Sequence, residues 1–176
     1  MIKSDFLKDS QDFIRIVEEN GFTPTILAVD DEPAIIDITE TIFIHIGLYN
    51  VITSENGVEA MKIISKRPVI DMVFVDDVMP EMEGHTLAEE IRKMPEYSDI
   101  PIVMIGSAYG DDYIESFLEK SGGSAYVRKP YQIKPLVTLT NKLLVNHYKL
   151  QAAKKDNQQG VISRLMAERE DWKRII

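Results

Sequence analysis

The middle of the chain alternates short apolar segments with longer segments of helical period, and this alternation restricts the fold more than any other feature. The apolar segments read PTILAVDD from residue 24, YNVITS from 49, VIDMVFVDD from 69, DIPIVMIGS from 99 and SAYVRKP from 124. Strands that alternate with helices form βαβ units, in which the strands are parallel. We therefore expect an α/β fold with a five-stranded parallel sheet, doubly wound by helices on its two faces.

The composition limits what such a fold can bind. Because the chain has no cysteine, metal chemistry would rest on carboxylates, which favour a hard cation. A formal net charge of -9 argues against direct nucleic-acid binding, which needs clustered basic residues. No apolar run approaches the roughly 20 residues that span a bilayer, and residues 1–13 lack the apolar core of a secretory signal. We expect a cytoplasmic protein that is not bound to a membrane.

Polar or small residues follow four of the predicted strands, at the point where each strand ends. They are Asp30 and Asp31, Asp76 and Asp77, Gly106 and Ser107, and Lys129. Open parallel sheets bind ligands beyond the carboxyl ends of their strands, so these groups are expected to meet at one edge. Taken alone, the Asp-Asp-Glu-Pro run at 30–33 is also a good helix start. The ordered set of acids, a hydroxyl and an ammonium group favours a shared site.

These segments resemble the receiver domain of two-component response regulators. The matching stretches are VDDEP at 29–33, VDDVMPEMEG at 75–84, IPIVMIGSAYGDD at 100–112 and AYVRKPY at 125–131. The resemblance covers about residues 24–148 and implies a flavodoxin-like sheet with the strand order 2-1-3-4-5. It leaves residues 1–23 as an N-terminal helical extension and residues 149–176 as a C-terminal helical extension or linker.

The resemblance implies a phosphoacceptor. In this family the phosphoacceptor aspartate lies four residues before the proline of a Met-Pro motif, and counting back from Pro80 gives Asp76. Asp77 then falls where the family's side chain varies, and we expect it to face solvent. Lys129 is expected to pair with Asp76 in the resting protein and with the phosphoryl oxygens after loading.

The resemblance also implies Mg²⁺ as the cofactor. A carboxylate is a poor nucleophile toward an anionic phosphoryl group unless a cation neutralises the developing charge. Mg²⁺ suits this role because it binds through one or two carboxylates, waters and the phosphate itself. The implied protein ligands are Asp31, Asp76, the backbone carbonyl of Val78 and, through a water, Asp30.

Two residues are implied in switching. The family keeps a Ser or Thr near the end of strand four and an aromatic residue on strand five, here Tyr126. Counting from Pro101 places the hydroxyl position at Gly106, whereas counting back from residues 108–111 places it at Ser107. Only the second alignment keeps a hydroxyl. We favour Ser107, with Gly106 absorbed as a bulge or as an irregularity at the strand end.

A phosphatase of the haloacid dehalogenase type is an alternative, because it also phosphorylates an aspartate at the end of a parallel strand. That mechanism needs a second aspartate two residues after the nucleophile. The residues two positions after Asp76 and Asp77 are Val78 and Met79. The sequence therefore argues against this alternative.

The two ends of the chain add helical segments. Residues 4–20 mix apolar with charged residues before Gly21, which predicts an amphipathic helix that packs on the receiver or on a partner. After the last predicted strand, leucines at helical spacing predict a helix that runs past the sheet. The polar residues at 154–160 then predict either a hinge or a solvated stretch of helix. An apolar face with nothing of its own to bury against then follows, formed by Ile162, Leu165, Trp172 and Ile176. This segment predicts a homodimer helix or a linker.

We therefore expect a receiver that takes a phosphoryl group from a sensor histidine kinase or phosphotransfer protein onto Asp76 and switches a partner or a dimer interface. Such a domain catalyses only its own loading and is not counted as an enzyme. The C-terminal helix resembles linkers that join receivers to cyclic-di-GMP enzymes, which implies a larger parent regulator. The alternative is a receiver-like adaptor or dimerisation module that works without phosphorylation. The sequence identifies neither the kinase nor the downstream target.

Overall fold

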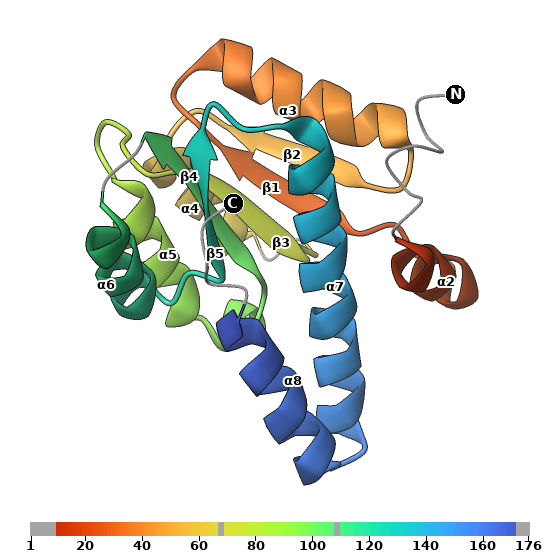
Figure 1. The fold of residues 1–176 in the computed structure, drawn as a ribbon. Helices are drawn as coiled ribbons and strands as arrows, with labels where there is room; N and C mark the ends of the chain where they lie inside the picture. Colours follow the sequence, from red (N-terminus) through yellow and green to blue (C-terminus); the bar gives the residue numbers. More distant parts are fainter. Residues whose placement is uncertain (1–9, 67–68, 108–109, 172–176) are drawn as a thin grey trace.

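A five-stranded parallel sheet forms the centre of the molecule (Figure 1). The computed structural model describes residues 10–66, 69–107 and 110–171. The strands are β1 (Thr25–Val29), β2 (Asn50–Ser54), β3 (Met72–Asp76), β4 (Ile102–Ser107) and β5 (Ala125–Lys129). They lie in the order β2-β1-β3-β4-β5, and every neighbouring pair is parallel. The predicted fold and strand order are confirmed.

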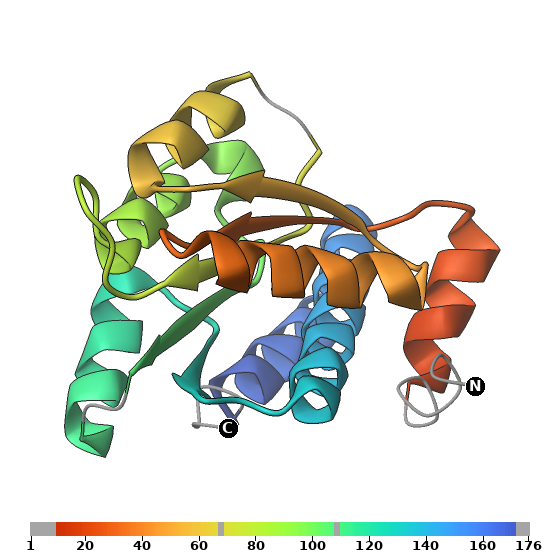
Figure 2. The same ribbon diagram turned by 90° about the horizontal axis from the view of Figure 1, so that it is seen from above.

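Helices cover both faces of the sheet, as Figure 2 shows from above. One face is packed by α4 (Gly57–Ser65), α5 (Gly84–Arg92) and α6 (Asp111–Ser121). The other is packed by α2 (Gln11–Asn20), α3 (Pro33–Ile46) and α7 (Ile133–Lys155). The 3₁₀ helix η1 (Pro95–Tyr97) precedes β4. Because both faces are covered, β3 is buried along its whole length, which explains its uninterrupted apolar sequence.

The N-terminal helix α2 packs on the sheet's own domain. Phe13 is fully buried, and its ring stacks on Tyr49 with ring centroids 5.3 Å apart. The helix ends at Gly21, whose φ of 63° is the left-handed conformation that glycine adopts readily at a helix end. The first part of the predicted helix, residues 4–9, lies outside the described residues.

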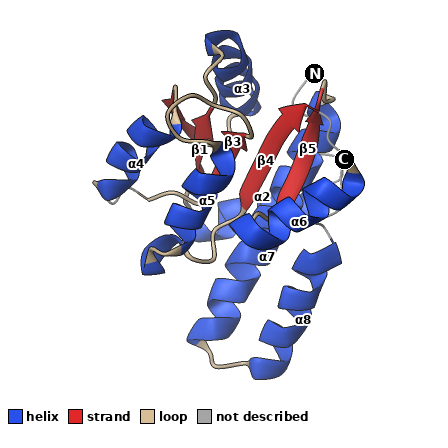
Figure 3. Cartoon of the chain, turned by 90° about the vertical axis from the view of Figure 1, so that its left-hand side faces the viewer, coloured by secondary structure: helices blue, strands red, loops and turns tan. Residues whose placement is uncertain are grey.

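At the other end of the chain, α8 (Gln159–Asp171) folds back beside α7 (Figure 3). The turn between them lies inside the predicted hinge at 154–160. Leu165 is 2% exposed and packs in a small cluster with Leu150 and Ala153. The expectation that this segment has nothing of its own to bury against is therefore wrong, because the apolar face of α8 is covered by α7. Trp172 and Ile176 lie outside the described residues.

Polar contacts fix the α7–α8 pair to the N-terminal end of β4. Arg169 donates from Nε to Asn146 Oδ1 at 2.6 Å and from Nη1 to the Asp99 carbonyl at 3.0 Å. Lys154 forms an ion pair with the Asp99 carboxylate. Asn146 in turn donates to the Leu165 carbonyl at 3.0 Å. The helix pair is thus attached through side chains of α7, α8 and the loop before β4.

His147 makes this attachment sensitive to acid. Burial, together with the nearby charge of Arg169, lowers the pKa of His147 to about 4. The other charged groups near His147 are Asp99, which favours the protonated form, and Lys154, which opposes it. Because the folded-state pKa lies below the ordinary value of about 6.5, the neutral imidazole stabilises the fold above pH 6.5. That contribution is lost as the pH falls from 6.5 toward 4.

We expect the free energy of unfolding of the wild type to fall more steeply with acid than that of His147→Gln. The difference between the two proteins should change by up to about 3 kcal/mol between pH 7 and pH 4. Urea titrations at several pH values measure the free energy of unfolding of each protein. Both proteins contain the same carboxylates, so the effect of carboxylate titration cancels in the difference between them. Parallel pH curves for the two proteins would contradict a neutral, buried His147.

Candidate phosphoacceptor site

The predicted site residues meet at the carboxyl ends of the strands. Asp76 is the last residue of β3, and Asp30 directly follows β1 beside it, since Val29 pairs with Val75. Lys129 ends β5 and pairs in register with Ser107 at the end of β4. The residues lining the pocket, a cavity of about 560 Å³, are Asp31, Glu32, Asp76, Val78, Gly106, Ser107 and Lys129. The structure therefore brings the predicted acids, the hydroxyl and the lysine together.

The Lys129 ammonium lies among three carboxylates of the site. Its Nζ lies 2.5 Å from Asp76 Oδ1, 3.1 Å from Asp30 Oδ2 and 3.7 Å from Glu32 Oε1. Burial by itself would lower the pKa of Lys129, but the hydrogen bond and charge of Asp76 and the charge of Asp30 raise it overall. The ammonium therefore stays charged and neutralises two nearly buried carboxylates.

Asp76 has both carboxylate oxygens in contact with the protein. Oδ1 faces Lys129, and Oδ2 accepts a hydrogen bond from the Val78 backbone N–H at 3.2 Å. Burial raises the pKa of Asp76 and outweighs the opposing effect of the Lys129 hydrogen bond. Only 7% of the residue is exposed, yet it lines the open pocket. The Asp76 carboxylate is thus held by two groups of the protein at the wall of the pocket.

The acid pair after β1 divides into a buried and an exposed member. Asp30 is 5% exposed, and its Oδ1 accepts a hydrogen bond from the Glu32 backbone N–H at 2.9 Å. Burial also raises the pKa of Asp30. Asp31 is exposed and lines the pocket. The N-cap of α3 is Glu32 and the helix has no side-chain capping hydrogen bond, so the helix-capping interpretation of the acid pair is wrong and Asp30 belongs to the acidic pocket.

Oxygen donors of the kind that Mg²⁺ prefers line this pocket. The carboxylates of Asp31 and Asp76 line it, and the carboxylate of Asp30 lies at the same two adjacent strand ends, where it contacts Lys129. Within the described ranges, no group of three acidic or histidine side chains is already converged as a metal centre. Lys129 is paired with two of these carboxylates, those of Asp30 and Asp76.

Asp77 corrects one expectation. It was expected to face solvent, but it is 3% exposed and accepts a hydrogen bond at Oδ2 from the Tyr126 hydroxyl at 3.1 Å. Burial raises the pKa of Asp77. Successive residues of a strand point to opposite faces of the sheet, so the residue after the pocket-facing Asp76 enters the core. That alternation was the signal in the sequence that could have placed Asp77 inside.

Strand β4 runs regularly through Gly106 and Ser107. Gly106 pairs with Arg128 and Ser107 with Lys129, one residue against one, so the expected bulge at Gly106 is absent from this ladder. Ser107 is exposed at the strand end and lines the pocket beside Lys129. The part assigned to Ser107 in switching stays a prediction.

Glu32 is a pocket residue that the sequence analysis missed. Its carboxylate lies 3.7 Å from the Lys129 ammonium, and its backbone N–H holds Asp30. The signal was present in the sequence, because Glu32 directly follows the acid pair, but it was assigned only to the start of a helix.

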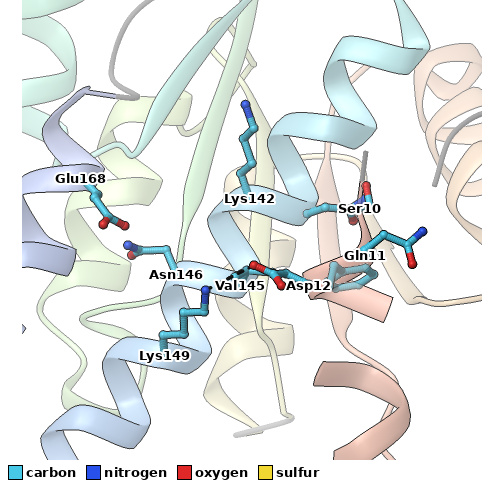
Figure 4. A pocket seen from close by; sticks show the side chains of 10 residues that line it. Ser10, Gln11, Asp12, Lys142, Val145, Asn146, Lys149 and Glu168 are labelled. Atoms are coloured by element: carbon cyan, nitrogen blue, oxygen red, sulfur yellow. Dashed lines mark hydrogen bonds and ion pairs between the residues drawn. The ribbon is translucent and has the colours of Figure 1, made fainter. Parts of the chain in front are cut away.

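A different hollow lies between α2, α7 and α8, where Figure 4 shows its lining side chains. Its charged groups come from different helices and compensate one another, as in the ion pair of Lys149 with Asp12 at 3.5 Å. The amide groups of Asn141 and Asn146 are already hydrogen bonded within the protein. This hollow contains no arrangement of acids and lysine like that at the strand ends.

Comparison with known protein families identifies the same region. The response regulator receiver domain matches residues 26–141. Response regulator SaeR of Staphylococcus epidermidis is 33% identical over 133 residues, covering 76% of this chain and 56% of the relative. SaeR of Staphylococcus aureus is 34% identical over 119 residues, covering 68% of this chain and 50% of the relative. The chain thus spans about half the length of these curated relatives.

Solved structures agree on the fold. A CheY-like response regulator receiver domain protein from Methanospirillum hungatei superposes with a TM-score of 0.66 at 25% identity, covering 73% of this chain and 98% of that one. The chemotaxis protein CheY4 of Vibrio cholerae gives a TM-score of 0.65 at 24% identity, covering 69% and 99%. Both likenesses cover nearly all of the other chain and about seven-tenths of this one.

Proposed function

The chain belongs to the response regulator receiver domain family, and we propose that it accepts a phosphoryl group on Asp76 from a sensor histidine kinase or a phosphotransfer protein. The observation that supports this most is the position of Asp76. It ends the central strand, contacts the Lys129 ammonium at 2.5 Å and faces a pocket lined by further acids.

The proposed reaction moves one phosphoryl group. A carboxylate oxygen of Asp76 attacks the phosphorus of a phosphohistidine as the phosphorus–nitrogen bond breaks, and the bonding electrons return to the imidazole. An aspartyl phosphate and a free histidine result. Lys129 stabilises the charge on the transferring oxygens, because its ammonium already lies within hydrogen-bond distance of the nucleophile. Later hydrolysis of the acyl phosphate restores the carboxylate.

We assign Mg²⁺ as the cofactor of this site, held by Asp31, Asp76 and the Val78 backbone carbonyl, with Asp30 acting through a water. The oxygen donors on the pocket wall fit a hard cation. When bound, the ion neutralises charge on the equatorial phosphoryl oxygens. Asp31 suits direct binding because it is exposed at the pocket, whereas Asp30 is tied to Lys129 and to the Glu32 N–H.

Signal output is proposed to pass through Ser107 and Tyr126 to the surface formed by α6, β5 and α7. Ser107 is next to Lys129 at the strand end, where its hydroxyl can donate to a phosphoryl oxygen. The recipient is a downstream protein, an output domain of a longer chain or a second copy through the C-terminal helices. In this role the chain catalyses its own loading only. No helix in the described part of the chain is long and apolar enough to cross a bilayer. We place the protein in the cytoplasm with its phosphodonor.

A phosphorylation-independent adaptor is the second candidate. Gly106 favours it, because one alignment with the family puts this residue, which has no hydroxyl, at the switch position. In that case the helices at the two ends would dock a partner regardless of loading.

Loading by a small phosphodonor separates the two candidates. Wild-type protein incubated with acetyl phosphate and Mg²⁺ should give a slower band in Phos-tag electrophoresis, and EDTA added before the donor should prevent it. The absence of a slower band with acetyl phosphate and with phosphoramidate, in a folded sample, would refute the phosphoacceptor function and leave the adaptor.

A further inference from the structure

We propose that Asp77 is a positioning residue that holds Tyr126 in the open space above Gly106, so that this tyrosine, rather than a side chain at position 106, responds to loading of Asp76. The proposal rests on the proposed function for its second half. Its first half, the position of Tyr126 in the resting protein, stands on the structure alone.

The first step is the location of the tyrosine. Tyr126 is fully buried and pairs with Met104 across the β4–β5 ladder, two residues before Gly106. Residues two apart on a strand share a face, so the ring extends along β4 toward Gly106. Its hydroxyl donates to Asp77 Oδ2 at 3.1 Å. Phe117 of α6 packs edge-on against the ring, with centroids 6.3 Å apart.

The second step is the space above Gly106. A β-carbon placed there would lie far inside van der Waals distance of the Tyr126 hydroxyl and 2.8 Å from Asp77 Cβ. Both the tyrosine hydroxyl and the Asp77 side chain thus use volume that any other residue at 106 would occupy. Gly106 is part of a regular parallel ladder, so the close approach, and not an unusual backbone angle, is what requires glycine.

The third step connects Asp77 with the phosphoacceptor. Asp77 donates its backbone N–H to the Ile105 carbonyl at 2.7 Å, and its own carbonyl accepts from the Gly84 N–H at 3.0 Å. Asp76 Oδ2 accepts from the Val78 N–H, so residues 76–78 form one hydrogen-bonded segment. A phosphoryl group on Asp76 adds oxygens that compete for the Val78 N–H and for Lys129. The segment that adjusts to them includes the carboxylate that holds Tyr126.

The test observes Tyr126 directly, by NMR of protein containing tyrosine labelled with ¹³C in the ring, with the Tyr126 signal assigned by its loss in Tyr126→Phe. In Asp77→Ala the hydroxyl loses its acceptor, and in Gly106→Ala the added methyl group occupies its space. We expect both variants to move the Tyr126 signal in the same direction before any donor is added. The population with a displaced ring should rise roughly tenfold in Asp77→Ala, as for loss of a hydrogen bond to a charged group.

Two further variants serve as controls. Asp77→Asn keeps an acceptor oxygen of the same size, so its Tyr126 signal should stay close to that of the wild type. Gly110→Ala is the matched glycine control, because a β-carbon there meets nothing within 4 Å. Circular dichroism and thermal unfolding show that each variant is folded before its spectrum is interpreted.

Loading then tests the second half of the proposal. Acetyl phosphate with Mg²⁺ should shift the Tyr126 signal of the wild type in the direction seen for Asp77→Ala. An unchanged Tyr126 signal in folded Asp77→Ala refutes the positioning role, whether or not the protein loads. A wild type that loads by Phos-tag electrophoresis without any shift of Tyr126 refutes the coupling and leaves the phosphoacceptor function intact. Failure to load refutes the proposed function, and the coupling with it.

Discussion

Asp76→Asn is expected to abolish phosphorylation by acetyl phosphate, whereas Asp77→Asn is expected to leave it in place. An amide has no carboxylate oxygen that can attack phosphorus, so replacing the nucleophile stops the reaction rather than slowing it. The two aspartates are adjacent in sequence but lie on opposite faces of the sheet, one against the pocket and one in the core beside Tyr126. The same substitution at neighbouring positions therefore gives opposite results.

Phos-tag electrophoresis and intact mass measure this difference. Asp77→Asn is the matched control, since it removes one negative charge at the same strand end. Loss of loading in both variants, with both folded, would mean that the acidic strand end as a whole is needed and would contradict a single nucleophile. Loading of Asp76→Asn at the wild-type rate would place the acceptor elsewhere.

Lys129→Met should lower the free energy of unfolding by roughly 2–3 kcal/mol, because it leaves the Asp30 and Asp76 carboxylates close together without a cation. The lysine side chain is 19% exposed, and those of Asp76 and Asp30 are 9% and 8% exposed, so water screens the two acids only in part. Mg²⁺ should return more stability to this variant than it adds to the wild type, since a cation that binds the folded state stabilises it by mass action.

Lys93→Met is the matched control for Lys129. Lys93 also makes a short ion pair, 2.6 Å from Glu90, but its side chain is 65% exposed. Exposed pairs contribute little, so no measurable change is expected. Urea unfolding of the three proteins with and without Mg²⁺ provides the comparison. Equal losses of unfolding free energy in the two variants would contradict the prediction, because they would show that the buried Lys129 pair contributes no more to stability than the exposed Lys93 pair.

The sequence predicted the sheet well because each strand is short, apolar and followed by a polar group or a turn. Those polar groups mark the carboxyl ends of the strands, so the pocket of Asp76, Asp30 and Lys129 follows directly from the strand pattern. The strand order and the metal ligands came only from the family resemblance, because the spacing of elements along the chain does not determine which strands are neighbours.

Two features of the structure were not predicted from the sequence. Asp77 was expected in solvent because it falls where the family's side chain varies, yet this residue, directly after the end of β3, is 3% exposed and lies in the core. The second feature is the covered apolar face of α8. Its partner is the far end of α7, and the fold-back at residues 156–158 that brings them together includes Asn157 with a φ of 54°. Polar residues predicted a break at that place but not the direction of the chain after it.

The central claim is that Asp76 carries the phosphoryl group, and chemical mapping of the loaded residue tests it most directly. Protein loaded with acetyl phosphate and Mg²⁺ is treated with borohydride, which reduces an acyl phosphate to an alcohol, and the peptide spanning β3 and the following loop is fragmented by mass spectrometry. The account predicts reduction at residue 76 alone, with Asp30, Asp31 and Asp77 unmodified. Reduction at residue 77, or at neither residue of a protein that has gained the phosphoryl mass, would contradict it.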